Sequence, residues 1–133
     1  MTDIRETVVA PPPPYAASRR VGKFVLTAGQ VPRNAAREVM GDSIEAQTVA
    51  VFDNLRRALA DSAANMSDVV KINVYLADIS EWSRFNVEYC RQMGDLRPVR
   101  TTIGCALNGV KIEVDAIAYL GDEPQMQTIG ALL

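Results

Sequence analysis

Two charged side chains stand out because each lies in an otherwise apolar, strand-like run. Arg100 belongs to the run 97–107 and Glu113 to the run 110–120. An arginine presents a rigid guanidinium fork that pairs bidentately with a carboxylate and stays charged at any working pH. A glutamate can polarise a water molecule or accept its proton. Together they favour a site that holds an acidic substrate and delivers water, with a surface position or an ion pair as the alternative for each.

Four further residues are candidates for substrate binding. Tyr15 follows the prolines 11–14, which form a stiff, polyproline-like segment that could hold an aromatic lid. Gly29 ends a β-rich run and would permit a close backbone approach. Asn86 could hydrogen-bond a ligand, and Thr102 shares a strand face with Arg100 and would leave room for a small molecule. Ordinary packing, a plain turn or a solvated helix face is the alternative in each case.

Composition excludes several kinds of chemistry. The chain of 133 residues has no histidine, so His-based triads and His metal sites are ruled out. Its two cysteines, Cys90 and Cys105, form neither a disulfide framework nor a metal-ligand spacing. A net charge of −2 does not favour a nucleic-acid partner. We expect no metal, no cofactor, no membrane span and no signal peptide, and therefore a cytoplasmic protein.

Hydrophobic periodicity predicts the elements that position these residues. Strands are expected over 23–31, 68–78, 97–107 and 110–120. One helix should begin after Asp42 or Ser43 and run to about residue 63, and a second should be opened by Ser80 with Glu81 and end at Gly94. The second helix should bury one stripe of large side chains: Trp82, Phe85, Tyr89 and Met93.

These elements predict a single α+β domain over 1–133, in the order β-β-β-α-β-α-β-β. A mixed sheet would carry two helices on one face. Residues 1–14 would provide an N-terminal strand and the proline-rich lead-in, and 121–133 a C-terminal tail. The strands are too apolar to leave the second face of the sheet in water, so we expect self-association to cover it.

Several segments, taken in order, resemble the Rid/YjgF family of enamine and imine deaminases, formerly described as L-PSP endoribonucleases. The segment 24–34, "FVLTAGQVPRN", resembles the family's strand-Gly-Gln-Pro block, and 46–59, with Gln47 and Asn54, resembles its first helix. The central strand and second helix, 68–93, match as well. "RPVRTT" and "VKIEVDAIA" resemble the paired signature strands near the end.

The resemblance implies a chorismate-mutase-like fold assembled as a homotrimer, with a central β-barrel and ligand clefts between subunits. It implies hydrolysis of a 2-imino or 2-enamino acid to a keto acid and ammonia, without a cofactor. In that reaction Arg100 would grip the substrate carboxylate and Glu113 would position the water. Tyr15 would close over the substrate, the backbone near Gly29 would help to hold it, and Asn86 would support the cleft.

The chain departs from the family pattern at three places. Thr102 stands where the best-studied branch has a cysteine, Leu107-Asn108-Gly109 replaces a Leu-Pro turn, and the tail 121–133 extends past the usual end. These differences leave the substrate open between 2-aminoacrylate and a larger acid such as 2-aminomuconate. A non-catalytic trimer that binds small metabolites is the second hypothesis, and a ribonuclease is the third.

Overall fold

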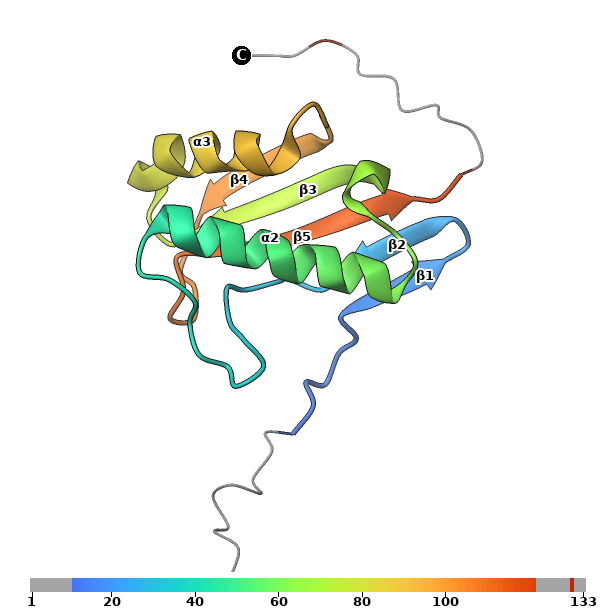
Figure 1. Cartoon of the computed structure of the whole chain (residues 1–133), viewed down its shortest axis with the longest axis horizontal. Helices are drawn as coiled ribbons and strands as arrows, with labels where there is room; N and C mark the ends of the chain where they lie inside the picture. The colour runs from blue at the N-terminus through green and yellow to red at the C-terminus, as the bar shows by residue number, and fades with distance from the viewer. Residues whose placement is uncertain (1–10, 122–129, 131–133) are drawn as a thin grey trace, which may run out of the picture.

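The computed structural model describes residues 11–121 and residue 130. Within them lies one five-stranded sheet with two α-helices (Figure 1). The elements follow each other as β1 Ser18–Val21, β2 Phe24–Thr27, α2 Ile44–Asp61, η1 Met66–Asp68, β3 Val69–Leu76, η2 Ile79–Glu81, α3 Trp82–Met93, β4 Val99–Gly104 and β5 Ile112–Tyr119.

The strands lie in the order β1-β2-β5-β3-β4. Only β3 and β4 are parallel, joined by α3, and the other neighbours are antiparallel. The predicted mixed sheet is therefore confirmed. The prediction that the last two strands pair with each other is wrong, because β3 lies between them. Residues 105–111 pass the end of β3, where the Cys105 amide donates to the Leu76 carbonyl (2.9 Å) and the Ala77 amide to the Lys111 carbonyl (3.0 Å).

Both helices pack on the same face of the sheet, as predicted (Figure 1). The first begins where expected, because the Ser43 side chain accepts a hydrogen bond from the Ala46 amide. The second is preceded by a 3-10 turn in which Asp78, rather than Ser80, accepts from the backbone. The core between helices and sheet is apolar, and its largest fully buried side chains include Phe52, Phe85, Ile44, Leu55, Leu59, Ile72, Leu76 and Ile112. Burial of this apolar surface is the main force that holds the helices on the sheet.

Three predicted details need correction. The strand predicted over 23–31 ends at Thr27, because the Thr27 hydroxyl, not a backbone carbonyl, accepts the Ala116 amide (3.0 Å), and only an isolated bridge from Gln30 to Val114 continues the pairing. β1, over 18–21, was not predicted as a strand. The predicted N-terminal strand within 1–14 falls mostly outside the described residues, and 11–14 are not in a strand.

The face of the sheet away from the helices carries exposed apolar side chains. Phe24 and Leu26 point away from the buried Val25 on β2, and they are 47% and 43% exposed. Val99 and Ile103 on β4 are 64% and 45% exposed. Side chains of this size are normally covered when they share one face of a sheet.

Polar groups on that face are paired with each other. Asp115 accepts from the Asn73 amide (2.8 Å) and the Tyr75 hydroxyl (2.9 Å), and Lys71 donates to Thr101 (2.8 Å). These bonds link β5 to β3 and β3 to β4 across the middle of the sheet. They satisfy polar side chains on a surface that is largely apolar around them.

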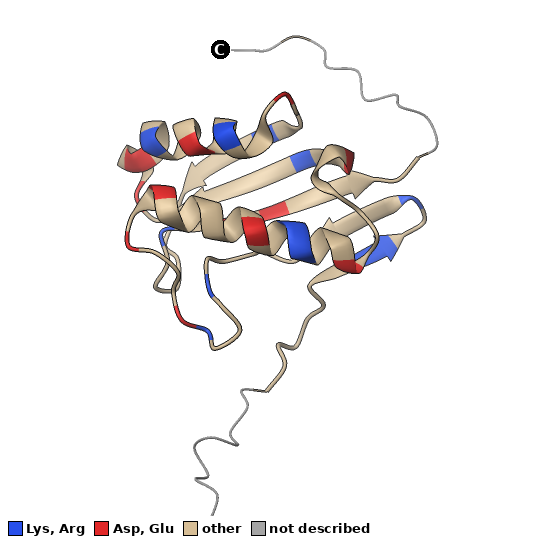
Figure 2. Ribbon diagram, viewed as in Figure 1, with Lys and Arg blue, Asp and Glu red and all other residues tan. Residues whose placement is uncertain are grey.

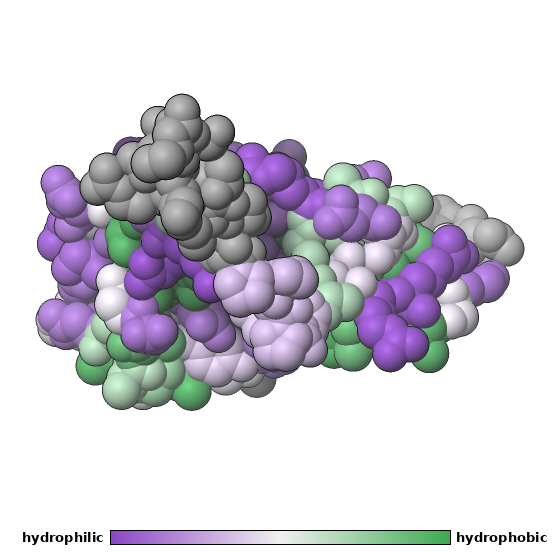
Figure 3. Space-filling model, turned by 90° about the horizontal axis from the view of Figure 1, so that it is seen from below, coloured by the Kyte–Doolittle hydropathy of each residue, from purple (hydrophilic) through white to green (hydrophobic). Residues whose placement is uncertain are grey.

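Both helices carry charges of both signs (Figure 2), and the view from below shows hydrophilic and hydrophobic residues interspersed (Figure 3). In the ribbon view of the described residues, basic and acidic positions lie close to one another on both helices (Figure 2). Among the described helices, none is long and apolar enough to cross a membrane.

Candidate functional site

Arg100 lies on β4 against the helix α3. Its Nη1 donates to the Asn86 side-chain oxygen at 2.8 Å. The guanidinium carbon also lies over three aromatic rings of α3, 4.5 Å from the centroid of Tyr89, 5.4 Å from Phe85 and 5.5 Å from Trp82. Ring faces attract the cation and restrict its motion. Across the described part of the chain no carboxylate pairs with Arg100, so its fork is held in place with its charge uncompensated.

Trp82 was predicted to belong to the core stripe, and this is wrong. It is 39% exposed, whereas Phe85, Tyr89 and Met93 are buried as predicted. The Trp82 ring instead covers the Arg100 guanidinium. Helical spacing placed it on the correct face of α3, and its position in the first turn leaves it at the rim.

Thr102 lies on the same face of β4 as Arg100, two residues further along. Its hydroxyl is buried and has no hydrogen-bond partner among the described residues. A buried hydroxyl without a partner costs free energy. Thr102 thus shares a strand face with Arg100, and Asn86 is hydrogen-bonded to Arg100, so the three residues form one group.

Glu113 lies near the start of β5, beside the backbone of Gly29. A Cβ atom at position 29 would lie 2.4 Å from Glu113 Oε2, so the carboxylate occupies space that only glycine leaves open. Burial raises the pKa of Glu113, and the neighbouring Asp115 carboxylate adds to the rise. A half-buried carboxylate with a raised pKa is a stronger base than an ordinary glutamate and is suited to proton transfer.

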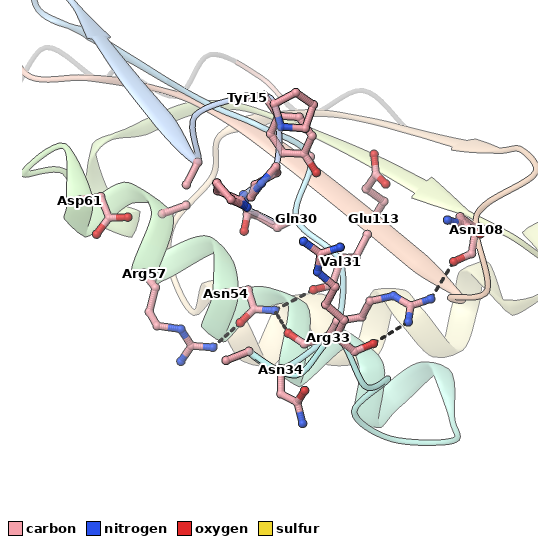
Figure 4. A pocket seen from close by; sticks show the side chains of 18 of the residues that line it. Tyr15, Gln30, Val31, Arg33, Asn34, Asn54, Arg57, Asp61, Asn108 and Glu113 are labelled. Carbon is pink, nitrogen blue, oxygen red and sulfur yellow. Dashed lines mark hydrogen bonds between the residues drawn. The ribbon is translucent and has the colours of Figure 1, made fainter. Parts of the chain in front are cut away.

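Glu113 and Gly29 line an open pocket of about 940 Å³ together with Tyr15. In Figure 4, Tyr15 and Glu113 lie along one side of this pocket, and Arg33, Asn54 and Arg57 lie along the other. The prolines 11–14 are also part of its wall. The predicted lid residue is thus adjacent to the predicted water-positioning residue.

Two amide side chains of α2 hold the loop between β2 and α2 and the backbone just before β5. Asn54, on α2, donates to the Val31 carbonyl (2.7 Å) and the Arg33 carbonyl (2.9 Å). Gln47, about two turns earlier on the same helix, donates to the Gly41 carbonyl (3.0 Å) and accepts from the Lys111 amide (2.8 Å). Asn54 itself lines the pocket, and Gln47 supports the backbone that precedes Glu113.

The six candidate residues fall into two groups on opposite faces of the sheet. The Arg100 group consists of Arg100, Asn86 and Thr102, and the Glu113 group consists of Glu113, Gly29 and Tyr15. Arg100 is opposite Ile72 on β3, while Glu113 is opposite Tyr75 on the same strand. Ile72 is buried under the helices, and Tyr75, three residues later, points the other way. One chain therefore does not bring its Arg100 group and its Glu113 group into a single site.

The pocket also contains arginines that sequence reasoning did not select. Arg33, Arg37 and Arg57 line it. Arg33 lies in the loop between β2 and α2, and no periodic pattern in the sequence marks it. Its side chain bonds one carbonyl nearby in sequence, that of Arg37, and one that is distant, that of Asn108. Within the described ranges, no cluster of three or more His, Cys, Asp or Glu side chains could hold a metal ion.

Comparisons with known proteins place this geometry in context. Residues 6–120 match the family model described as "Endoribonuclease L-PSP". A RutC family protein of Pyrococcus abyssi is 35% identical over 118 residues, which cover 85% of this chain and 93% of that protein.

Solved structures agree with this match. The crystal structure of yeast Mmf1 is 30% identical, with a TM-score of 0.78 over 85% of this chain and 94% of that chain. A Mycobacterium tuberculosis member of the "highly conserved YjgF/YER057c/UK114 family" is 30% identical, with a TM-score of 0.70 over 79% and 86% of the two chains.

Proposed function

Because the chain belongs to the YjgF/YER057c/UK114 family, we propose that it hydrolyses 2-imino and 2-enamino acids to 2-keto acids and ammonia. The observation that carries this proposal is Glu113, a half-buried carboxylate of raised pKa at the wall of an open pocket beside Tyr15 and Gly29. Such a group activates water without a metal.

The complete site forms between two copies of the chain. The Arg100 group of one subunit faces the Glu113 group of its neighbour in a cyclic homotrimer whose sheets close a central barrel. Two features support this arrangement: the two groups lie on opposite faces of the sheet, and the second face carries exposed Phe24, Leu26, Val99 and Ile103. Closed cyclic assembly would cover that face in every copy.

In the assembled site each residue has one role. Arg100 pairs with the substrate carboxylate through its guanidinium fork, and Asn86 with the aromatic rings keeps the fork oriented. The Thr102 hydroxyl, unpaired among the described residues, donates to the same carboxylate. Tyr15 covers the substrate and reduces its exposure to water.

Glu113 carries the proton transfers. It accepts a proton as water attacks the imine carbon, and the electrons of the C=N bond move to nitrogen. The same carboxyl gives this proton to the nitrogen, and the carboxylate then carries the remaining hydroxyl proton to the nitrogen as the C–N bond breaks, so that ammonia leaves and the C=O bond of the keto acid forms. An enamine enters this sequence after it gains a proton at carbon and loses one from nitrogen, which converts it to the imine.

Imine trapping tests the proposal directly. An amino-acid oxidase generates a 2-imino acid in situ, and semicarbazide captures whatever imine survives. We expect the wild-type protein to lower semicarbazone formation and to release keto acid and ammonia in equal amounts. Arg100→Lys keeps the charge but loses the fork, so kcat/KM should fall on the order of 10-fold.

A matched control for Arg100→Lys is Arg97→Lys, because Arg97 lies three residues earlier and its side chain donates to the carbonyls of Gly94 and Leu96. It should behave as wild type. If the wild-type protein binds 2-keto acids but leaves every imine to the trap, a non-catalytic metabolite-binding protein is the correct description.

The pH dependence of the reaction should report Glu113. The carboxylate must be ionised to accept a proton from water, and burial followed by Asp115 raises its pKa. Activity should therefore fall as the pH drops through a pKa above the ordinary glutamate value. Asp115→Asn removes a like charge, so the acidic limb of the kcat/KM profile should move to lower pH, and only partly, because burial remains. A limb that stays in place, or moves upward, would contradict this assignment.

A further inference from the structure

The lining of the pocket carries an excess of positive charge. Arg33, Arg37 and Arg57 line the pocket, and the acidic residues of its described lining are Asp61 and Glu113. Within the described residues no carboxylate lies within salt-bridge distance of any of the three guanidinium groups. They bond instead to neutral oxygens, which leaves their charges uncompensated.

Of the three arginines, Arg33 donates the most side-chain hydrogen bonds among the described residues. Its Nη1 donates to the Arg37 carbonyl at 2.8 Å and its Nη2 to the Asn108 carbonyl at 2.9 Å. The Asn54 side chain holds the Arg33 backbone in turn. A guanidinium has five N–H donors, so these two bonds fix its direction and leave the other donors available. Arg33 is also half-buried, whereas Arg37 and Arg57 are exposed.

Arg33 lies close to the reacting end of the pocket without occupying it. Asn108, to which it is bonded, directly precedes the turn that leads into β5 and Glu113. Figure 4 shows the Arg33 side chain extending toward Asn108, below Glu113. The pKa of Glu113 is raised by burial and by Asp115, as expected if the arginines do not neutralise that carboxylate.

We infer that Arg33, supported by the charges of Arg37 and Arg57, forms a second anion subsite that binds the side-chain carboxylate of a dicarboxylic 2-imino acid. This inference rests on the proposed function. The 2-carboxylate would pair with Arg100 of the neighbouring subunit, the imine carbon would face Glu113, and the distal carboxylate would pair with Arg33. A charged donor at a fixed position discriminates strongly between a substrate that carries the matching acid group and one that lacks it.

The test compares two imines of equal chain length. Glutamate and norvaline, oxidised in situ, yield 2-iminoglutarate and 2-iminopentanoate, which differ by the distal carboxylate. The measured quantity is the ratio of kcat/KM for the two imines. Arg33→Gln should lower this ratio by about 10- to 100-fold, the factor expected for loss of a charge-assisted hydrogen-bond pair. Arg20→Gln is the matched control, because Arg20 is exposed and also bonds a backbone carbonyl, that of Gly22. It should leave the ratio unchanged.

Equal loss with both imines would mean that Arg33 only holds its loop, and this would overturn the subsite. An unchanged ratio would overturn it as well. Arg33→Lys restores the charge without the fork and should recover part of the ratio if the charge is what the substrate contacts.

Binding separates this inference from the proposed function. Calorimetry with 2-oxoglutarate and 2-oxopentanoate requires no turnover. We expect 2-oxoglutarate to bind the wild-type protein more tightly and to lose this advantage in Arg33→Gln. If neither imine is hydrolysed but this preference is present, the deaminase proposal fails and the subsite stands. If the two keto acids bind equally to the wild-type protein, the subsite is overturned whatever the activity.

Discussion

Glu113→Gln should lower the rate of imine hydrolysis by about 10²–10⁴-fold, the contribution typical of a positioned general base. Glutamine keeps the size of the side chain and can still hydrogen-bond water, but it cannot accept a proton. Because Gly29 leaves room for an Oε atom at this position, the substituted amide fits without moving the loop. The loss should therefore appear in kcat, and binding of the keto-acid product should be little changed.

Stopped-flow or trap-competition kinetics measure kcat, and calorimetry with the keto acid measures binding. The matched control is Glu38→Gln, an exposed glutamate of the 28–40 loop that accepts from the Asn34 side chain (3.2 Å). Its activity should equal that of the wild-type protein. Full activity in Glu113→Gln would assign water activation to another group and remove the central element of the proposed mechanism.

Mixing two inactive variants should restore activity, and this is the second large effect we expect. Arg100→Ala removes the carboxylate grip, and Glu113→Gln removes the base. If each site takes Arg100 from one subunit and Glu113 from its neighbour, a random 1:1 mixture of subunits gives one site in four with both residues intact. The expected recovery is about one quarter of wild-type activity after unfolding and refolding the two chains together.

The separately refolded variants, combined without subunit exchange, are the control and should remain inactive. A site built within one chain cannot be restored by mixing, because every chain lacks one of the two groups. Absence of recovery, with trimers verified by light scattering, would therefore rule out the shared site. Because Arg100 and Glu113 lie on opposite faces of the sheet, the result depends on whether the site is shared between two subunits.

Local sequence pattern determined much of the fold. Alternation along 110–120 is typical of a strand with one covered face, and Val114, Ala116 and Ala118 are buried on one face of β5. Three- and four-residue spacing of apolar residues is typical of a helix with one buried stripe, as α2 has, and Ser43 caps its start as predicted. These features depend on residues close together in the chain, whose geometry follows from the period of the helix or strand alone.

The sequence identified individual residues of the candidate site, but it did not predict how they are arranged relative to one another. Composition and strand alternation singled out Arg100, Glu113 and Thr102, and the family resemblance added roles for Tyr15, Gly29 and Asn86. Nothing in the sequence indicated that Trp82 would lie over Arg100. Nor did it mark Arg33, because one of its two partners, the Asn108 carbonyl, reaches it only where two loops meet.

Only the tertiary structure decided how the two charged residues are related. Alternation establishes which residues share a face of one strand, but it does not determine which other strand lies beside that strand. The placement of β3 between β4 and β5 follows from long-range pairing and helix packing. That order, with the register of Ile72 and Tyr75, puts Arg100 against α3 and Glu113 on the opposite face. Arg100 and Glu113, which lie on consecutive strands in the sequence, therefore belong to separate halves of the proposed intersubunit site.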